Sequence, residues 1–249
     1  MNMKNRIHFI DNFCFQNDTG IYRYSSLDYV EKGFVGFSSP EHWKDLHEHL
    51  FLHAKYRYNR SLIPFKFVNR IFCLCLTKTE QCEAAWKAYG NNIVKFEVCC
   101  DSLMNMLEDN VDKYDIYVGK VNYVLKSDLE RKSPLKLLNV KKDDFEKDET
   151  WVKLLFYKTK AFEYENEIRI VLVSDGKENC DRIKLRYNMT ISDLFPKVFL
   201  SPDLGECDSY VNVNKLVNLG YSPEAIQKDD LYKCGKYRET INLDYGSNL

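Results

Sequence analysis

The sequence predicts a protein of the α+β class, a single domain with mixed and antiparallel sheets and flanking helices. The chain has 249 residues, 45% of them hydrophobic, which is enough to bury a sizeable core. Short apolar segments with strand character alternate irregularly with segments of helical character. No repeat and no proline-rich or glycine-rich linker separates two halves, so we expect one domain over residues 1–249.

The first elements are predicted from short apolar runs and from capping residues. Residues 21–24 and 34–38 have strand character, and a helix is expected to begin near Ser25 or Ser26 between them. A second helix is expected from Pro40, because Ser39 is a suitable N-cap and proline suits the first helical position. The amino-terminal part is therefore predicted to alternate strand and helix.

The remaining elements follow the same patterns of apolar residues. Strands are expected at 70–77, 92–98, 163–173 and 182–188, and a strand or hairpin is expected at 115–124. Two further strands are expected, one in the segment that begins at residue 195 and one near 225–228. Helices are expected at 80–90, ending at Gly90, at 101–108, and after the strand near 200. The strands at 163–173 and 182–188 are predicted to form a hairpin across residues 174–181. Residues 126–158 are highly charged and are predicted to be a helix and loop insertion, a candidate mobile segment.

Composition excludes several classes of protein. A net charge of -1 gives no general attraction to nucleic acid or to an anionic membrane. The longest strongly apolar run, residues 71–76, is far shorter than the ~20 residues that span a bilayer, and the first residues lack the apolar centre of a signal peptide. We therefore expect a cytoplasmic protein without a membrane partner. The nine cysteines include no CxxC pair, so we expect reduced thiols rather than a zinc site.

Charged residues occupy every second position from Glu163 to Arg169. In a strand, Glu163, Glu165, Glu167 and Arg169 would all lie on one face. Such a row is either a solvated sheet face or the wall of a cleft that holds carboxylates beside one another. The second possibility would suit acid and base chemistry or the stabilisation of a cation.

Aromatic residues suggest a place for a ligand near the start of the fold. Arg23 lies between two tyrosines, and its guanidinium could bind a phosphate while a neighbouring ring stacks on a base. Trp86 and Tyr89 are three residues apart on one predicted helix face. The alternatives are a packed strand with one exposed arginine and an aromatic pair in the core.

Histidines are concentrated at His42, His47, His49 and His53. With Asp45 and Glu48 they could form the site of a metal-dependent hydrolase. The order does not match HExxH, and no distant ligand can be identified, so we assign no metal ligands and favour solvated helix residues. The sequence also contains no P-loop, no GxGxxG, no GxSxG and no kinase signature.

The order of short motifs resembles an uncharacterised bacterial domain family. The chain has an opening YRY, an FSSPEHWKDLHE box, CLT, AAWKAYG, VNY and a late EYENEIRI, from about Tyr22 to Tyr232. Lys44-Asp45-Leu46 replaces the Asn-Asp-Pro that the family box favours, Thr77 stands for a serine, and Ile168 stands for an aromatic residue.

That family is in turn similar to the ADP-ribosyltransferase fold. The resemblance implies that Arg23 binds the pyrophosphate of NAD and that Thr77 supports the nicotinamide, with Tyr24, Trp86 or Tyr89 stacking on it. It also implies that Glu167 is the catalytic acid and that Glu165 orients or deprotonates the acceptor. A fixed carboxylate would stabilise the oxocarbenium-like sugar formed when nicotinamide leaves. NAD is then a substrate, and no metal is expected.

The resulting expectation is an NAD-using protein that modifies a protein or nucleic acid, or hydrolyses NAD. By analogy with the fold, a bacterial toxin or phage-defence effector is the expected context. Replacing Glu167 by Gln is expected to remove activity and to leave folding intact. The alternatives are a non-catalytic module that binds a nucleotide or a protein, the metal-dependent nuclease or hydrolase around Asp45 and Glu48, and a charged row that is only a solvated sheet face.

Overall fold

The structure is a computed structural model, and it describes residues 7–15, 20–43, 45, 47–58, 60–89, 92–176 and 180–233. The side chains of His42 and Tyr89 lie outside this description. Within these ranges, no helix combines the length and the apolar character that crossing a bilayer requires.

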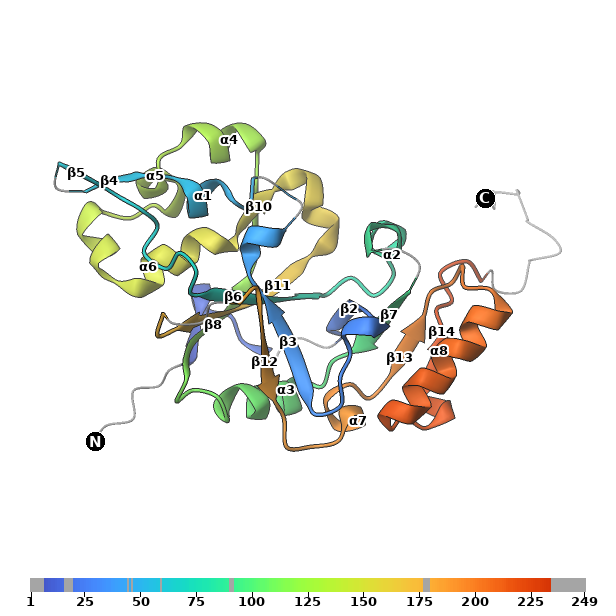
Figure 1. Ribbon diagram of the computed structural model, residues 1–249. Helices are drawn as coiled ribbons and strands as arrows, with labels where there is room; N and C mark the ends of the chain where they lie inside the picture. The colour runs from blue at the N-terminus through green and yellow to red at the C-terminus, as the bar shows by residue number, and fades with distance from the viewer. Residues whose placement is uncertain are drawn as a thin grey trace, which may run out of the picture.

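One mixed sheet organises the described part of the chain (Figure 1). Its main path runs in the order β1-β8-β11-β6-β2-β7-β13-β14, and β3 and β12 branch from β6. The strands are β1 (Ile7–Phe9), β2 (Tyr22–Ser26), β3 (Phe34–Ser38), β6 (Ile71–Thr77), β7 (Ile93–Glu97), β8 (Tyr114–Lys120), β11 (Glu167–Ser174), β12 (Arg182–Arg186), β13 (Val198–Leu200) and β14 (Ile226–Lys228). The branch arises because Thr77 pairs with Tyr22 of β2, whereas Cys73 pairs with Ser38 of β3.

Short strand pairs lie outside this sheet. β4 (Tyr56–Tyr58) and β5 (Ser61–Ile63) form an antiparallel hairpin. β9 (Asn122–Val124) pairs in parallel with β10 (Tyr157–Thr159), and this pairing joins the two ends of the predicted insertion.

The central strand β11 is buried on both faces, between antiparallel neighbours β6 and β8. Alternate side chains enter two different hydrophobic clusters. Ile170 and Leu172 belong to the first core, whereas Val171 and Val173 belong to the second core. Glu167 and Arg169 are an even number of positions from Val171 along the strand, so their side chains lie on the same face as Val171, the face of the second core.

Helices cover both faces of the sheet. The first core includes side chains of α3 (Cys100–Glu108), α7 (Ile191–Leu194) and α8 (Glu206–Leu219), and the second includes side chains of α1 (Leu50–His53), α4 (Lys126–Arg131) and α6 (Asp148–Lys153). The other α-helices in the described residues are α2 (Glu83–Tyr89) and α5 (Pro134–Leu138). In α3, Leu103, Met106 and Leu107 recur at helical spacing and are all buried, which explains how this helix docks. The chain is thus an α+β protein with a mixed sheet and flanking helices.

Most predicted elements are confirmed, and the corrections concern ends and partners; the helix end predicted at Gly90 lies outside the described residues. The helix expected near Ser25 or Ser26 is wrong, because β2 continues to Ser26 and only one 3-10 turn, Leu27–Tyr29, follows. Ser39 does cap a helix, since its side chain accepts a hydrogen bond from the amide of Glu41, but that helix is the single 3-10 turn Pro40–His42.

The predicted hairpin between the last long strands is also wrong. β12 pairs with β3, and β11 is occupied on both sides by β6 and β8. Sequence adjacency suggested the hairpin, but both edges of β11 already have partners. β12 consequently extends the branch of the sheet.

The charged insertion is more than a connector. It contains α4, α5, the 3-10 turns Lys142–Glu146 and Leu154–Phe156, and α6. Trp151, Val152 and Phe156 are buried in the second core. Its carboxyl-terminal half therefore helps to hold the sheet.

Candidate functional site

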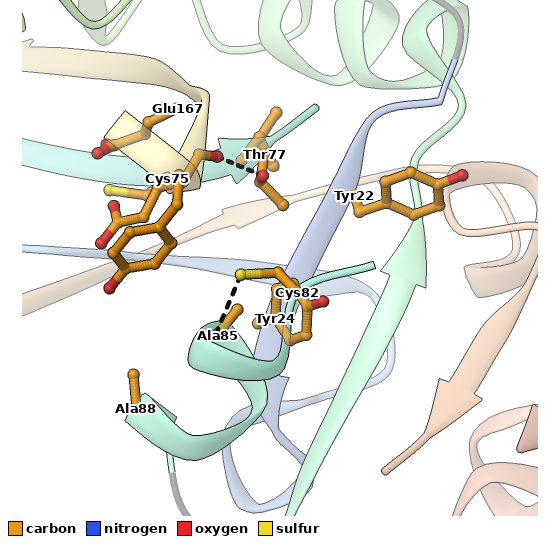
Figure 2. Close-up of a pocket in the computed structure, with 11 residues that line it drawn as sticks. Tyr22, Tyr24, Cys75, Thr77, Cys82, Ala85, Ala88 and Glu167 are labelled. Atoms are coloured by element: carbon orange, nitrogen blue, oxygen red, sulfur yellow. Dashed lines mark hydrogen bonds between the residues drawn. The ribbon is translucent and has the colours of Figure 1, made fainter. Parts of the chain in front are cut away.

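A cleft lies where the ends of β6 and β11 approach α2. Its lining combines carboxylates, thiols, a hydroxyl and aromatic rings: Tyr22, Tyr24, Cys75, Leu76, Thr77, Cys82, Ala85, Ala88, Tyr164, Glu165 and Glu167. Figure 2 shows Glu167, Cys75 and Thr77 on one side, and Tyr24 with Ala85 and Ala88 on another. The cavity volume is about 70 Å³, which suits a single ring rather than a complete drug-sized ligand.

Glu165 reaches the cleft from a turn and not from a strand. Residues Lys160–Glu165 form a 3-10 helix, Asn166 is left-handed with φ 42°, and β11 begins only at Glu167. The prediction that the charges from Glu163 to Arg169 share one strand face is therefore wrong. Asparagine tolerates the left-handed conformation, so the 3-10 helix can end at Asn166, one residue before the strand begins.

Threonine hydroxyls hold this turn against β6. The hydroxyl of Thr77 donates to the carbonyl oxygen of Glu165 and accepts from the amide of Thr79 at 2.9 Å. The hydroxyl of Thr79 donates to the carbonyl oxygen of Tyr164 at 2.9 Å. Thr77 thus lines the cleft and also positions the segment that carries Glu165.

Glu167 is fixed by a planar pair of bonds from Arg169. Arg169 Nε lies 2.7 Å from Glu167 Oε1, and Arg169 Nη2 lies 2.9 Å from Glu167 Oε2. The two side chains are 2% and 1% exposed, so this is a buried, charge-assisted pair with defined orientation. The amide of Glu167 also donates to the hydroxyl of Tyr123 at 2.9 Å.

Glu48 and Lys158 complete what we call the ion cluster, formed by Glu48, Lys158, Glu165, Glu167 and Arg169. Lys158 Nζ lies 2.6 Å from Glu165 Oε2, 2.8 Å from Glu48 Oε1 and 3.4 Å from Glu167 Oε2. Arg169 Nη2 donates to Glu48 Oε2 at 3.0 Å. Three carboxylates thus face two cations, which leaves the cluster with one negative charge when all are ionised.

The cluster moves the pKa values of its two cleft carboxylates in opposite directions. Burial alone would raise the pKa of Glu167, but Arg169 and Lys158 outweigh it and the pKa is lowered. For Glu165, burial dominates over the attraction of Lys158, and the pKa is raised. Glu167 therefore stays ionised, and Glu165 holds a proton more readily than an ordinary glutamate.

The cations and the neighbouring thiol respond to the same environment. Burial opposes the charge of Lys158 and Arg169, yet the surrounding carboxylates outweigh it and raise the pKa of both side chains. Burial, reinforced by Glu167, raises the pKa of the Cys75 thiol. Cys75 is thus a neutral thiol beside an ionised carboxylate, and not an activated nucleophile.

The structure brings only part of the predicted cofactor-binding set to the cleft. Tyr24 and Thr77 line it. Trp86 is buried behind Tyr24, with the rings edge to face at 5.0 Å between centroids. Arg23 is absent from the lining, because it alternates with Tyr22 and Tyr24 along β2, and its guanidinium donates to the carbonyl oxygen of Gly36 at 3.4 Å. The side chain of Tyr89 lies outside the described residues.

Two described residues of the FSSPEHWKDLHE box, Trp43 and Glu48, contact the ion cluster. The Trp43 ring lies 4.2 Å from the guanidinium carbon of Arg169, and Glu48 binds both cations. Asp45 accepts from the ring of His47 at 3.0 Å. In the described part of the chain, no three His, Cys, Asp or Glu side chains are grouped to hold a metal ion. Lys44 and Leu46 lie outside the described residues.

Sequence reasoning missed Lys158 and gave no role to Tyr123. Both residues reach Glu167 through the pairing of β9 with β10, which joins segments far apart in the chain. The VNY motif contains Tyr123 and was the signal available in the sequence. Nothing in the sequence around Lys158 distinguishes it from the other lysines of the insertion.

Comparison with known proteins adds one finding. Residues 85–170 match the model of a family described as Protein of unknown function (DUF2971). The predicted resemblance to an uncharacterised domain family is confirmed over this segment, which contains Trp86, Lys158 and β11 as far as Ile170. Searches of curated proteins and of solved structures find no match.

Proposed function

We propose that this protein binds NAD in the cleft and cleaves the bond between nicotinamide and ribose. The ADP-ribose would pass to a protein, a nucleic acid or water. The observation that carries the proposal is the pair Glu165 and Glu167, which line one cleft and have pKa values displaced in opposite directions. Such a displacement separates an acid or base from a fixed charge.

Glu167 would stabilise the cation formed in the first step. When the C1′–N1 bond breaks, its electron pair leaves with nicotinamide, which departs neutral, and the ribose becomes an oxocarbenium-like cation. Arg169 holds the ionised Glu167 carboxylate at the wall of the cleft, where its negative charge would attract such a cation. The remaining negative charge of the ion cluster acts in the same direction.

Glu165 would act in the second step. As the acceptor attacks C1′, it loses a proton, and a carboxylate with a raised pKa is a stronger base for that proton than an ordinary glutamate. Lys158 bonds to both Glu165 and Glu167, so it sets the position of the base relative to the fixed charge. Lys158 is a positioning residue in this scheme.

Aromatic rings would hold the nicotinamide. Tyr24 lines the cleft, and Tyr164 is 41% exposed at its lip. Trp86 packs on Tyr24 from behind and would support it without contacting the ligand. Because the cleft suits one ring, the diphosphate and adenosine would lie outside it. The proposal assigns no role to Arg23.

The test is nicotinamide release from NAD, measured with and without bacterial lysate as a source of acceptors. We expect Glu167→Gln and Glu165→Gln each to lower release by roughly 100-fold, the scale of one electrostatic or acid–base group. Glu163→Gln is the matched control, because Glu163 lies in the same turn, is exposed and does not line the cleft.

The structure changes one expectation about the Glu167 variant. Removing one partner of a buried ion pair costs about 3–5 kcal/mol, so we expect Glu167→Gln to destabilise the fold. Nicotinamide release by the variant and the wild type must therefore be compared at equal folded fraction, measured by circular dichroism. Wild-type protein that releases no nicotinamide under either condition would overturn the proposal. So would a folded Glu167→Gln variant with full turnover.

A second candidate is a module that binds a nucleotide without reacting. It is favoured by one observation: both carboxylate oxygens of Glu167 already accept bonds from Arg169. Calorimetric binding of NAD with no nicotinamide release would identify this case. In that event the ion cluster would hold the walls of the cleft together.

A further inference from the structure

A second cavity, of about 340 Å³, lies apart from the cleft and shares no lining residue with it. It is bounded by α1 and β4 on one side and by α4, α5 and α6 of the insertion on the other. Figure 1 shows these elements together at one end of the molecule, with α2 of the cleft elsewhere. Its volume is within the range of small-molecule sites.

Aromatic rings form much of its wall. Phe51, Tyr56, Tyr58, Phe145 and Trp151 all line the cavity. The Trp151 ring packs edge to face on Tyr56 at 4.8 Å and on Phe145 at 5.1 Å. The indole nitrogen of Trp151 donates to the carbonyl oxygen of Phe145 at 2.7 Å, which fixes the ring. These contacts give a preformed wall suited to a planar apolar group.

The rim of the cavity is basic. Lys55, Arg57, Lys132 and Lys142 line it, and Glu130 is the acid among the lining residues. Glu130 Oε1 already lies 3.5 Å from His47 Nε2 and 3.7 Å from Lys126 Nζ. Lys132 pairs with Asp128 at 3.0 Å, and Lys142 lies over the Tyr58 ring.

Lys55 and Arg57 differ from the other rim cations. Within the described ranges, neither has a carboxylate partner, and both are exposed. They are two residues apart where the chain enters β4, so both lie on the strand face opposite to Tyr56, and both line the cavity. Two adjacent cations that lack a carboxylate partner among the described residues can together bind one acidic group.

We propose that this cavity binds a small aromatic acid, with the ring against Phe145 and Trp151 and the anionic group at Lys55 and Arg57. The ring burial supplies affinity, and the cations select an anion over a neutral analogue. The site is independent of the NAD chemistry proposed for the cleft, since the lining residues differ.

The test is calorimetric titration of the full chain with naphthalene-2-carboxylate and with naphthalene-2-carboxamide. We expect the carboxylate to bind and the amide to bind about tenfold more weakly, the scale of a hydrogen bond to a charged group. The double variant Lys55→Gln, Arg57→Gln should lose that preference. Lys136→Gln is the control, because Lys136 is exposed on α5 and does not line the cavity.

Further measurements separate the ring from the charge. Decanoate carries the same carboxylate on a flexible alkyl chain and is expected to bind more weakly than naphthalene-2-carboxylate. Leu135→Trp, at a lining residue that is 38% exposed, should block the cavity. Equal binding of acid and amide, unchanged binding in the double variant, decanoate as tight as the aromatic acid, or no binding of the aromatic acid would each overturn the proposal.

Discussion

At the scale of single residues, Glu167 and Glu165 should give opposite dependences of stability on pH. The lowered pKa of Glu167 means that its contribution is present above the unfolded pKa of about 4.3 and is lost as pH falls through the folded value. Glu167→Gln should therefore lower the free energy of unfolding most at neutral pH, and the difference from wild type should shrink below about pH 4.5.

Glu165→Gln is the matched comparison. Its raised pKa means that the folded state retains a proton that the unfolded state loses, so this contribution is present at low pH and disappears as pH rises through the folded value. The destabilisation by Glu165→Gln should not grow toward neutral pH. Urea unfolding between pH 3.5 and 7.5 measures both, and a pH-independent effect of Glu167→Gln would contradict the lowered pKa.

The residue scale also shows what the sequence could predict about the site. Alternation correctly drew attention to Glu165 and Glu167, and both line the cleft. The route to that result was wrong, because Asn166 is left-handed and Glu165 lies on a turn. Asparagine often adopts the left-handed conformation, but one asparagine does not predict it when the flanking residues alternate as in a strand.

At the scale of elements, the insertion shows why a high content of charged residues did not predict a mobile segment correctly. Residues 126–158 are rich in charged side chains, yet Trp151, Val152 and Leu154 are buried in the second core. The helices here are short, so a helical period has few turns in which to appear. The parallel pairing of β9 with β10 was also hidden, because it depends on residues separated by the whole insertion.

Trp151→Ala tests whether the insertion stabilises the sheet. Trp151 is 4% exposed and packs against Tyr56, Phe65 and Phe145, so its truncation should lower the free energy of unfolding by about 3–5 kcal/mol. Leu125→Ala is the control, since Leu125 is 58% exposed and should change the free energy by less than about 0.5 kcal/mol. Chemical denaturation measures the free energy of unfolding of both variants. Equally small effects would show that the insertion does not stabilise the sheet.

At the scale of the whole molecule, the class of the fold was accessible from the sequence, but the connections of the sheet were not. Apolar runs indicated β6, β7 and β11, and the serine before Pro40 indicated the N-cap at Ser39. The branch of the sheet at β6 depends on Tyr22 and Ser38 pairing with different residues of one strand. Such pairings are set by packing in three dimensions, which local propensity does not contain.

The shared sheet predicts that both cores unfold together. Leu172 enters the first core and Val171 the second, although they are neighbours on β11, so neither core can lose its packing without exposing the same strand. Leu172→Ala and Val171→Ala should each lower the unfolding midpoint measured by circular dichroism and by tryptophan emission to the same extent. Tryptophan emission reports mainly on the second core, which includes Trp151 and contacts Trp43. Two separate transitions, with each variant shifting only one, would show that residues 1–249 do not behave as the single domain predicted from the sequence.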